Sequence, residues 1–192
     1  MKHTIAFFVA LLATPFLFGQ THLTYRDVPL DGTLDRVISV LQGKGLEYTG
    51  AISENMVQMG YLSNGQPIDV MVVSNPETGK VFRVVVLTQP KSKWRSLRKE
   101  YGVYKKQLMA QYGEPTTYEL FLYPYDTKKK QRRRQMQALH EEKAMCSSFF
   151  HVTDDEGQPL GDITLTISPY AHLARVAIYY NDTLNAPLED NN

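Results

Sequence analysis

Apolar residues recur at helical spacing in two segments of the chain, residues 33–42 and 92–112. The stripe of the first segment consists of Leu34, Val37, Ile38 and Leu41. The stripe of the second consists of Trp94, Leu97, Tyr101, Tyr104, Leu108 and Tyr112. Because a helix brings residues three and four apart onto one face, each spacing predicts an amphipathic helix. Gly113, followed by Pro115, is typical of the end of a helix.

Strand-like segments follow each predicted helix. They cover residues 54–62, 68–74 and 80–88 after the first helix, and 117–123, 144–153, 162–168 and 175–181 after the second. Ile163, Leu165 and Ile167 alternate with polar residues, which is typical of an antiparallel sheet with one packed and one solvated face. The helix stripes are the natural cover for the packed face. The sequence therefore predicts an α+β fold whose helices pack on one face of the sheet.

A short motif occurs twice in the chain. Residues 65–68 read Gly-Gln-Pro-Ile, and residues 157–160 read Gly-Gln-Pro-Leu. Arg83 and Arg175 each follow the glycine of their own motif at the same spacing of 18 residues. Two matches at one fixed offset indicate an internal repeat. We expect two tandem units, each a helix followed by antiparallel strands.

These patterns divide the chain into parts. Residues 20–185 are predicted to form a single α+β domain, since its length suits one hydrophobic core. Its two halves cover residues 28–88 and 91–182, and the second half contains an insertion at about 124–143. Residues 186–192 are predicted to be a flexible tail.

The first residues have the pattern of a targeting sequence. Lys2 precedes an apolar run over residues 4–18, and the small residue Gly19 follows it. This order predicts a secretory signal peptide over residues 1–19. The run is shorter than the roughly 20 residues that span a bilayer, and Pro15 disfavours the alternatives of an uncleaved anchor or a buried helix. We therefore expect a periplasmic or secreted protein with no transmembrane span after cleavage.

The composition is that of a folded chain and excludes several classes of protein. Of 192 residues, 43% are hydrophobic and 21% are charged, and the formal net charge is +1. The apolar fraction argues against disorder, and the charge balance argues against a nucleic-acid-binding surface over the whole protein. A single cysteine, Cys146, excludes an internal disulfide. Its strand-like context favours an inert buried thiol.

The insertion at 124–143 is the basic part of the chain. It carries seven basic and three acidic side chains. The candidate anion-binding residues are Lys128, Lys129, Lys130, Arg132, Arg133 and Arg134. In an exported protein their partner would be an envelope protein or an anionic glycan or lipid, and no nucleic acid. The alternative is a solvated helix that contacts nothing, since charge runs are usually exposed faces.

The remaining chemistry-bearing residues form no catalytic motif. His140-Glu141 begins a zinc-protease signature, but Ala144 stands at the position of the second histidine. Residues 154–157 (Asp-Asp-Glu-Gly) are interpreted as a hairpin turn, and His151 as an ordinary strand residue. The 12 tyrosines are interpreted as packing between strands and helix, although exposed aromatic rings also bind sugars or partners. We expect no catalytic, cofactor-binding or metal-binding residue.

Residues 29–35, 44–46 and 94–115 together resemble small exported proteins of unknown function from Bacteroidetes-type bacteria. The shared motifs are helix caps and turns, so the resemblance implies export and an α+β repeat and carries no catalytic residue. The helix-then-sheet order also resembles the β-lactamase-inhibitor-type and outer-membrane-assembly lipoprotein folds, at the level of architecture alone.

Two functional hypotheses follow. The first is a non-enzymatic binding or interaction protein of the cell envelope, which would use the exposed sheet face or the basic segment. The second is a hydrolase of the cell envelope or of polysaccharides, whose signature would be two carboxylates brought together from distant parts of the chain. A cleft with such a carboxylate pair distinguishes the two.

Overall fold

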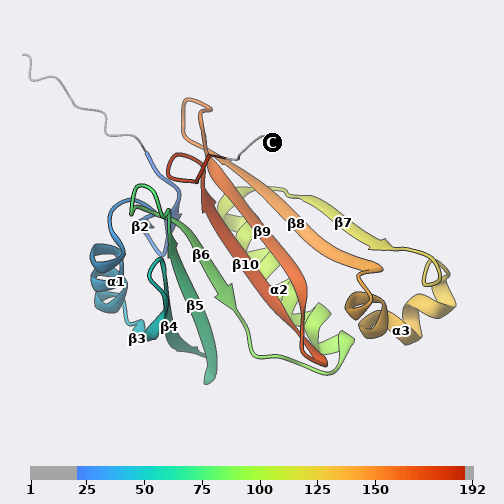
Figure 1. Cartoon of the computed structure of the whole chain (residues 1–192). Coiled ribbons are helices and arrows are strands. Elements are labelled where there is room, and N and C mark those ends of the chain that lie inside the picture. The colour runs from blue at the N-terminus through green and yellow to red at the C-terminus, as the bar shows by residue number, and fades with distance from the viewer. Residues whose placement is uncertain (1–20, 189–192) are drawn as a thin grey trace, which may run out of the picture.

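A computed structural model describes residues 21–188 of the chain, and for residues 128–133 it describes the backbone alone. Figure 1 shows one broad sheet with helices against it. The strands of the sheet are β3 (Glu47–Ser53), β4 (Met56–Ser63), β5 (Gln66–Ser74), β6 (Val81–Leu87), β7 (Thr116–Phe121), β8 (Ala144–Thr153), β9 (Pro159–Tyr170) and β10 (Leu173–Asp182). The other elements are the hairpin strands β1 (Thr24–Tyr25) and β2 (Val28–Pro29) and the helices α1 (Leu34–Gly43), α2 (Trp94–Tyr112) and α3 (Lys128–His140).

The eight-stranded sheet is antiparallel, with the order β3-β4-β5-β6-β10-β9-β8-β7. Strands that are neighbours in the sequence also pair in the sheet, except at the centre, where β6 pairs with β10. The strands after α1 therefore lie on one side of this central pair, and the strands after α2 lie on the other. The predicted α+β class with an antiparallel sheet is confirmed.

Helices α1 and α2 bury their apolar stripes against the same core. Val37 and Leu41 of α1 and Leu97 of α2 are buried, and they belong to one cluster with the apolar residues of the central strands. In β9 the predicted alternation places Ile163 and Leu165 in this core, and neither is exposed to solvent. The aliphatic stripes thus cover one face of the sheet, as the spacing predicted.

The structure corrects the sequence analysis at three elements. Strand β3 was not predicted, because it is an edge strand with bulges and nearly all its side chains are exposed, so it has no apolar alternation. The hairpin of β1 and β2 was also missed, because a strand of two residues is too short to show an alternation of apolar and polar residues. The basic insertion does not form a helix without contacts, because Ala138 and Leu139 of α3 are buried and α3 packs on β8 and β9.

The other face of the sheet carries polar side chains together with a small apolar patch. Thr164 and Thr166 lie on this face of β9, in agreement with the predicted solvated side. On the central pair, however, Val85, Leu87 and Ala177 form a second buried cluster with Met71 and Tyr179. Cross-strand neighbours shield these small residues: Val85 lies between Met71 of β5 and Tyr179 of β10. The solvated face is therefore apolar at its centre.

Candidate ligand-binding cleft

The hairpin of β1 and β2 has an unusual turn. Tyr25 pairs with Val28, so Arg26 and Asp27 form a two-residue loop, and their φ angles are 51° and 58°. Two positive φ angles define a type I′ turn, which normally contains Asn-Gly. Each left-handed residue other than glycine costs about 1–2 kcal/mol. Such strain concentrates at functional positions, and it directs attention to Arg26.

A buried carboxylate holds this hairpin against the end of the sheet. Asp182 has no exposed surface. It accepts hydrogen bonds from the backbone N–H groups of Leu23 and Asn185, each at 2.9 Å, and lies 3.1 Å from Nδ1 of His22. We call Asp182 and these three partners the Asp182 clasp. It fixes the N-terminal segment, and with it the hairpin, onto the end of β10.

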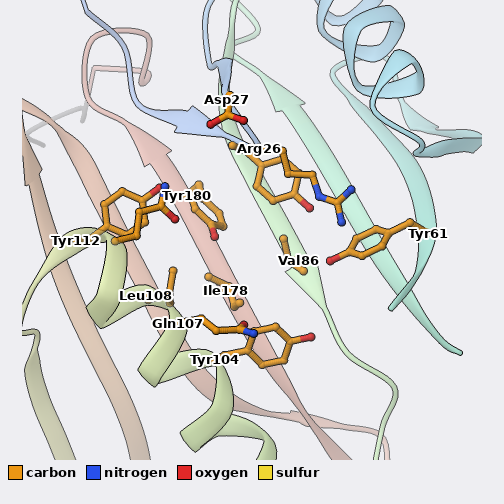
Figure 2. A pocket seen from close by; sticks show the side chains of 12 residues that line it. Arg26, Asp27, Tyr61, Val86, Tyr104, Gln107, Leu108, Tyr112, Ile178 and Tyr180 are labelled. Carbon is orange, nitrogen blue, oxygen red and sulfur yellow. The ribbon is translucent and has the colours of Figure 1, made fainter. Parts of the chain in front are cut away.

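A cleft of about 280 Å³ lies between the hairpin and α2, on the helix-covered side of the sheet. Its apolar lining includes Val86 of β6, Ile178 of β10 and Leu108 of α2. Figure 2 shows Arg26 extending from the hairpin toward Tyr61, with the α2 side chains facing them from the other wall. Five tyrosines contribute to the lining, namely Tyr25, Tyr61, Tyr104, Tyr112 and Tyr180. We call this hollow the tyrosine cleft.

The hydroxyls of Tyr25, Tyr104 and Tyr180 are neutral and have few partners among the described residues. Tyr25 is 5% exposed and its Oη atom is buried; the hydroxyl of Tyr61 is its polar neighbour, but no hydrogen bond of standard geometry joins Oη to a described residue. Its ring meets the ring of Tyr180 edge-on, with 5.2 Å between centroids. Burial raises the pKa of Tyr25 and of Tyr180 well above the usual range and raises the pKa of Tyr104 to about 12. At neutral pH these phenols are therefore hydrogen-bond donors.

The guanidinium of Arg26 is the only cationic group that lines this cleft. Its Cζ lies 3.9 Å from the centroid of the Tyr61 ring, a cation–π contact that holds it in place. Within the part of the chain that the structure describes, no carboxylate lies within 4.0 Å of it. Asp27, the only acidic residue in the lining, is 3.5 Å from Nζ of Lys44. The cleft thus presents an unpaired cation beside neutral donors.

A second hollow of about 380 Å³ adjoins the first along α2. The two hollows share Tyr104 and Gln107, so they meet at the middle of the helix. In the second hollow Lys91 and Glu100 form an ion pair at 2.7 Å, and Glu100 also accepts a hydrogen bond from Thr88 at 3.0 Å. Lys91 and Glu100 are therefore paired with each other, in contrast to Arg26, whereas Lys99, which also lines this hollow, has no ion pair with a described residue.

The anion-binding candidates lie on another part of the molecule. They belong to α3, which packs on β8 and β9 and lies on the opposite side of the molecule from α1 (Figure 1). Arg134 is exposed and sits at a kink in α3, with φ of −132°. The side chains of the other five, residues 128–130, 132 and 133, are outside the described part. The structure does not bring this segment to the tyrosine cleft, and its anion-binding role stays a prediction.

The carboxylates required by the hydrolase hypothesis are not gathered in either hollow along α2. The tyrosine cleft is lined by one acidic residue, Asp27, and the second hollow by Glu100 alone. A shallow hollow beside α1 has both Asp35 and Glu54 in its lining, but both are exposed, and burial is what makes one carboxyl of such a pair an acid. The described residues contain no cluster of three or more metal-ligating side chains.

Two smaller expectations concern Cys146 and the turn at 154–157. Cys146 is buried, and although Nη1 of Arg98 lies 2.7 Å from its Sγ, desolvation raises the pKa of the thiol. A protonated thiol is a poor nucleophile, which supports the interpretation of Cys146 as an inert residue.

The turn predicted at residues 154–157 is confirmed, because Oδ1 of Asp154 accepts hydrogen bonds from the backbone N–H groups of Glu156 and Gln158.

Comparisons with protein-family models, curated proteins and solved structures found no match to this chain. The function is therefore argued from the tyrosine cleft itself. Sequence reasoning missed this cleft because its walls come from β1, β4, β6, α2 and β10. The only signal in the sequence was the abundance of tyrosine, which we interpreted as packing.

Proposed function

We propose that this chain is an exported, non-enzymatic binding protein of the cell envelope and that its binding site is the tyrosine cleft. The observation that carries the proposal is the buried, unpartnered Oη of Tyr25 in a concave site beside the unpaired Arg26. A buried polar group without a partner costs about 1–3 kcal/mol. A ligand that supplies an acceptor recovers this cost once the Tyr25 ring turns its hydroxyl toward the cleft, because the Oη atom itself has almost no exposed surface.

Export is supported by the signal-peptide pattern of residues 1–19, which lie outside the described part. None of the described helices is long and apolar enough to cross a membrane. We propose a periplasmic or secreted location on the sequence pattern. Cell fractionation tests it, and recovery of the protein with its N-terminus intact in the cytoplasm would contradict it.

We also propose that the fold arose as two tandem repeats, α1 with β3–β6 and α2 with β7–β10. Gly65 and Gly157 hold corresponding turns, between β4 and β5 and between β8 and β9, with φ of 74° and 80°. Arg83 and Arg175 lie on the two central strands, β6 and β10. In this arrangement the tyrosine cleft lies between the halves, and the insertion with α3 belongs to the second half alone.

The binding function is tested by blocking the cleft. Gln107 is exposed on α2 and lines both hollows, so Gln107→Trp fills them. Lys106 is exposed on the same helix and lines neither, so Lys106→Trp is the matched control. Each purified full-length protein is incubated with a small-molecule extract of the cell envelope, and bound masses are read by native mass spectrometry.

We expect adducts on the wild type and on Lys106→Trp, and their loss on Gln107→Trp. Adducts that survive the cleft-filling variant would place the binding site elsewhere and overturn the proposal. Absence of adducts on the wild type would do the same. Conversion of extract components into new masses by the protein would instead favour the hydrolase.

A further inference from the structure

The groups that converge on the tyrosine cleft are mostly hydrogen-bond donors. Arg26 contributes a guanidinium with five N–H donors, and Tyr25 contributes a buried hydroxyl without a partner. Tyr104 and Tyr180 form no hydrogen bond to another described residue, and their raised pKa values keep their hydroxyls protonated. Such a set lacks one component, a strong acceptor with negative charge.

The guanidinium of Arg26, an exposed side chain, already rests on the ring of Tyr61 before any ligand arrives. The left-handed backbone at Arg26 aims its side chain across the cleft, and the ring of Tyr61 supports it at 3.9 Å. The one nearby carboxylate, Asp27, is 91% exposed at its side chain and paired with Lys44, so it competes little for the guanidinium. A preorganised, unpaired arginine favours carboxylate groups, which it binds through two parallel hydrogen bonds.

Beyond these donors, the lining combines the apolar residues Val86, Ile178 and Leu108 with the amides of Gln107 and Gln111, and this mixture restricts the ligand further. Val86, Ile178 and Leu108 form the closed apolar floor of the cleft, since each is at most 5% exposed, and a small organic group can pack on this floor and on the tyrosine rings. The volume of about 280 Å³ suits a small organic group, since ligand sites generally begin near 300 Å³. A longer ligand continues past Tyr104 and Gln107 into the second hollow.

We infer that the tyrosine cleft binds an organic carboxylate, with the carboxylate on Arg26 and the tyrosine hydroxyls and the apolar body on Val86, Ile178 and Leu108. The inference rests on the proposed binding function and names the chemistry of its ligand. An aliphatic chain with a terminal carboxylate and an aromatic amino acid with a free carboxylate share this chemistry. Decanoate and N-acetylphenylalanine represent the two sources, and the amide of each serves as its uncharged control.

The test is isothermal titration of the full-length protein with these four compounds. We expect saturable binding of at least one carboxylate and binding at least about tenfold weaker for its amide, because the amide cannot form the charge-assisted pair of hydrogen bonds with Arg26. Arg26→Gln lowers the carboxylate affinity by about tenfold or more and leaves the amide affinity unchanged. Arg95 is exposed on α2 and lines neither hollow. Arg95→Gln therefore leaves the affinities for the carboxylate and for the amide unchanged.

A second variant separates loss of charge from loss of folding. Asparagine tolerates left-handed φ angles, so Arg26→Asn keeps the turn and removes the guanidinium. Its thermal midpoint is expected to equal or exceed that of the wild type, with the same loss of carboxylate binding. Equal affinity for a carboxylate and its amide, or full carboxylate affinity in Arg26→Asn, would overturn the inference.

The two proposals fail in different ways. If the wild type binds neither probe carboxylate while envelope adducts still disappear in Gln107→Trp, the ligand chemistry is wrong and the binding function stands. If the adducts are absent as well, both proposals fail. Preferential binding of decanoate or of N-acetylphenylalanine identifies the source of the carboxylate.

Discussion

Replacing Tyr25 by phenylalanine is expected to stabilise the unliganded protein. The hydroxyl of Tyr25 is buried and forms no hydrogen bond of standard geometry with a described residue, its neighbour Tyr61 included, and an unsatisfied buried polar group costs about 1–3 kcal/mol. Phenylalanine keeps the ring and its edge-on contact with Tyr180, while the lost oxygen leaves a small void. The net gain is about 1 kcal/mol in the free energy of unfolding, or roughly 3 °C in Tm for a chain of this size.

Tyr101→Phe is the matched control for this experiment. Tyr101 is 4% exposed, close to the 5% of Tyr25, but its hydroxyl lies 2.7 Å from Oγ of Ser148 in a hydrogen bond. Removing that bond is expected to cost about 1 kcal/mol. Urea unfolding, followed by circular dichroism, measures both variants against the wild type.

The outcome separates two descriptions of the cleft. If the free energy of unfolding rises in Tyr25→Phe and falls in Tyr101→Phe, the fold leaves the Tyr25 hydroxyl unpaired, at a cost in stability, and available to a ligand. A loss of about 1 kcal/mol or more in Tyr25→Phe would mean that the hydroxyl already has a favourable partner in the folded state. That result would remove the observation on which the proposed function rests.

Three further predictions concern the framework of the cleft. Asp182→Ala leaves two buried backbone N–H groups of the clasp without an acceptor. It is expected to lower the free energy of unfolding, measured by urea unfolding, by about 3 kcal/mol. A loss as small as that caused by Asp162→Ala, at an exposed position, would contradict the role of the clasp. A Cβ atom on Gly161 would fall on the carbonyl oxygen of Asn181, so Gly161→Ala should cost about 3 kcal/mol. Gly102→Ala, where the added atom meets nothing within 4 Å, should instead gain up to about 1 kcal/mol, and similar effects of the two glycine variants would refute the close approach. Burial raises the pKa values of Tyr25, Tyr104 and Tyr180, so their contribution to stability is complete below about pH 10, the unfolded value, and is lost as pH rises through the folded values. Urea midpoints measured from pH 8 to pH 11 should fall at the upper end, and a flat profile would contradict this.

Local pattern determined much of the fold. The stripe of 92–112 predicted α2, which the structure places at Trp94–Tyr112, and the strand predicted at 144–153 is β8 with the same bounds. These segments could be predicted because each buries one face, so that apolar residues recur every three or four positions in the helix and at alternate positions in the strand. The turn at 154–157 was readable for a different reason, because an aspartate that caps neighbouring N–H groups acts within a few residues.

Only the tertiary structure decided where a ligand can bind. Edge strand β3 buries almost nothing, and the turn at Arg26 and Asp27 departs from the residues that normally mark a type I′ turn, so neither left a pattern. The cleft tyrosines are far apart in the sequence and meet only because β6 pairs with β10 and brings α2 opposite the hairpin. Whether a tyrosine hydroxyl finds a partner or faces a cavity depends on which elements pack around it. The sequence thus determined the helices, most strands and their buried faces, while the site arises from long-range packing that no local period records.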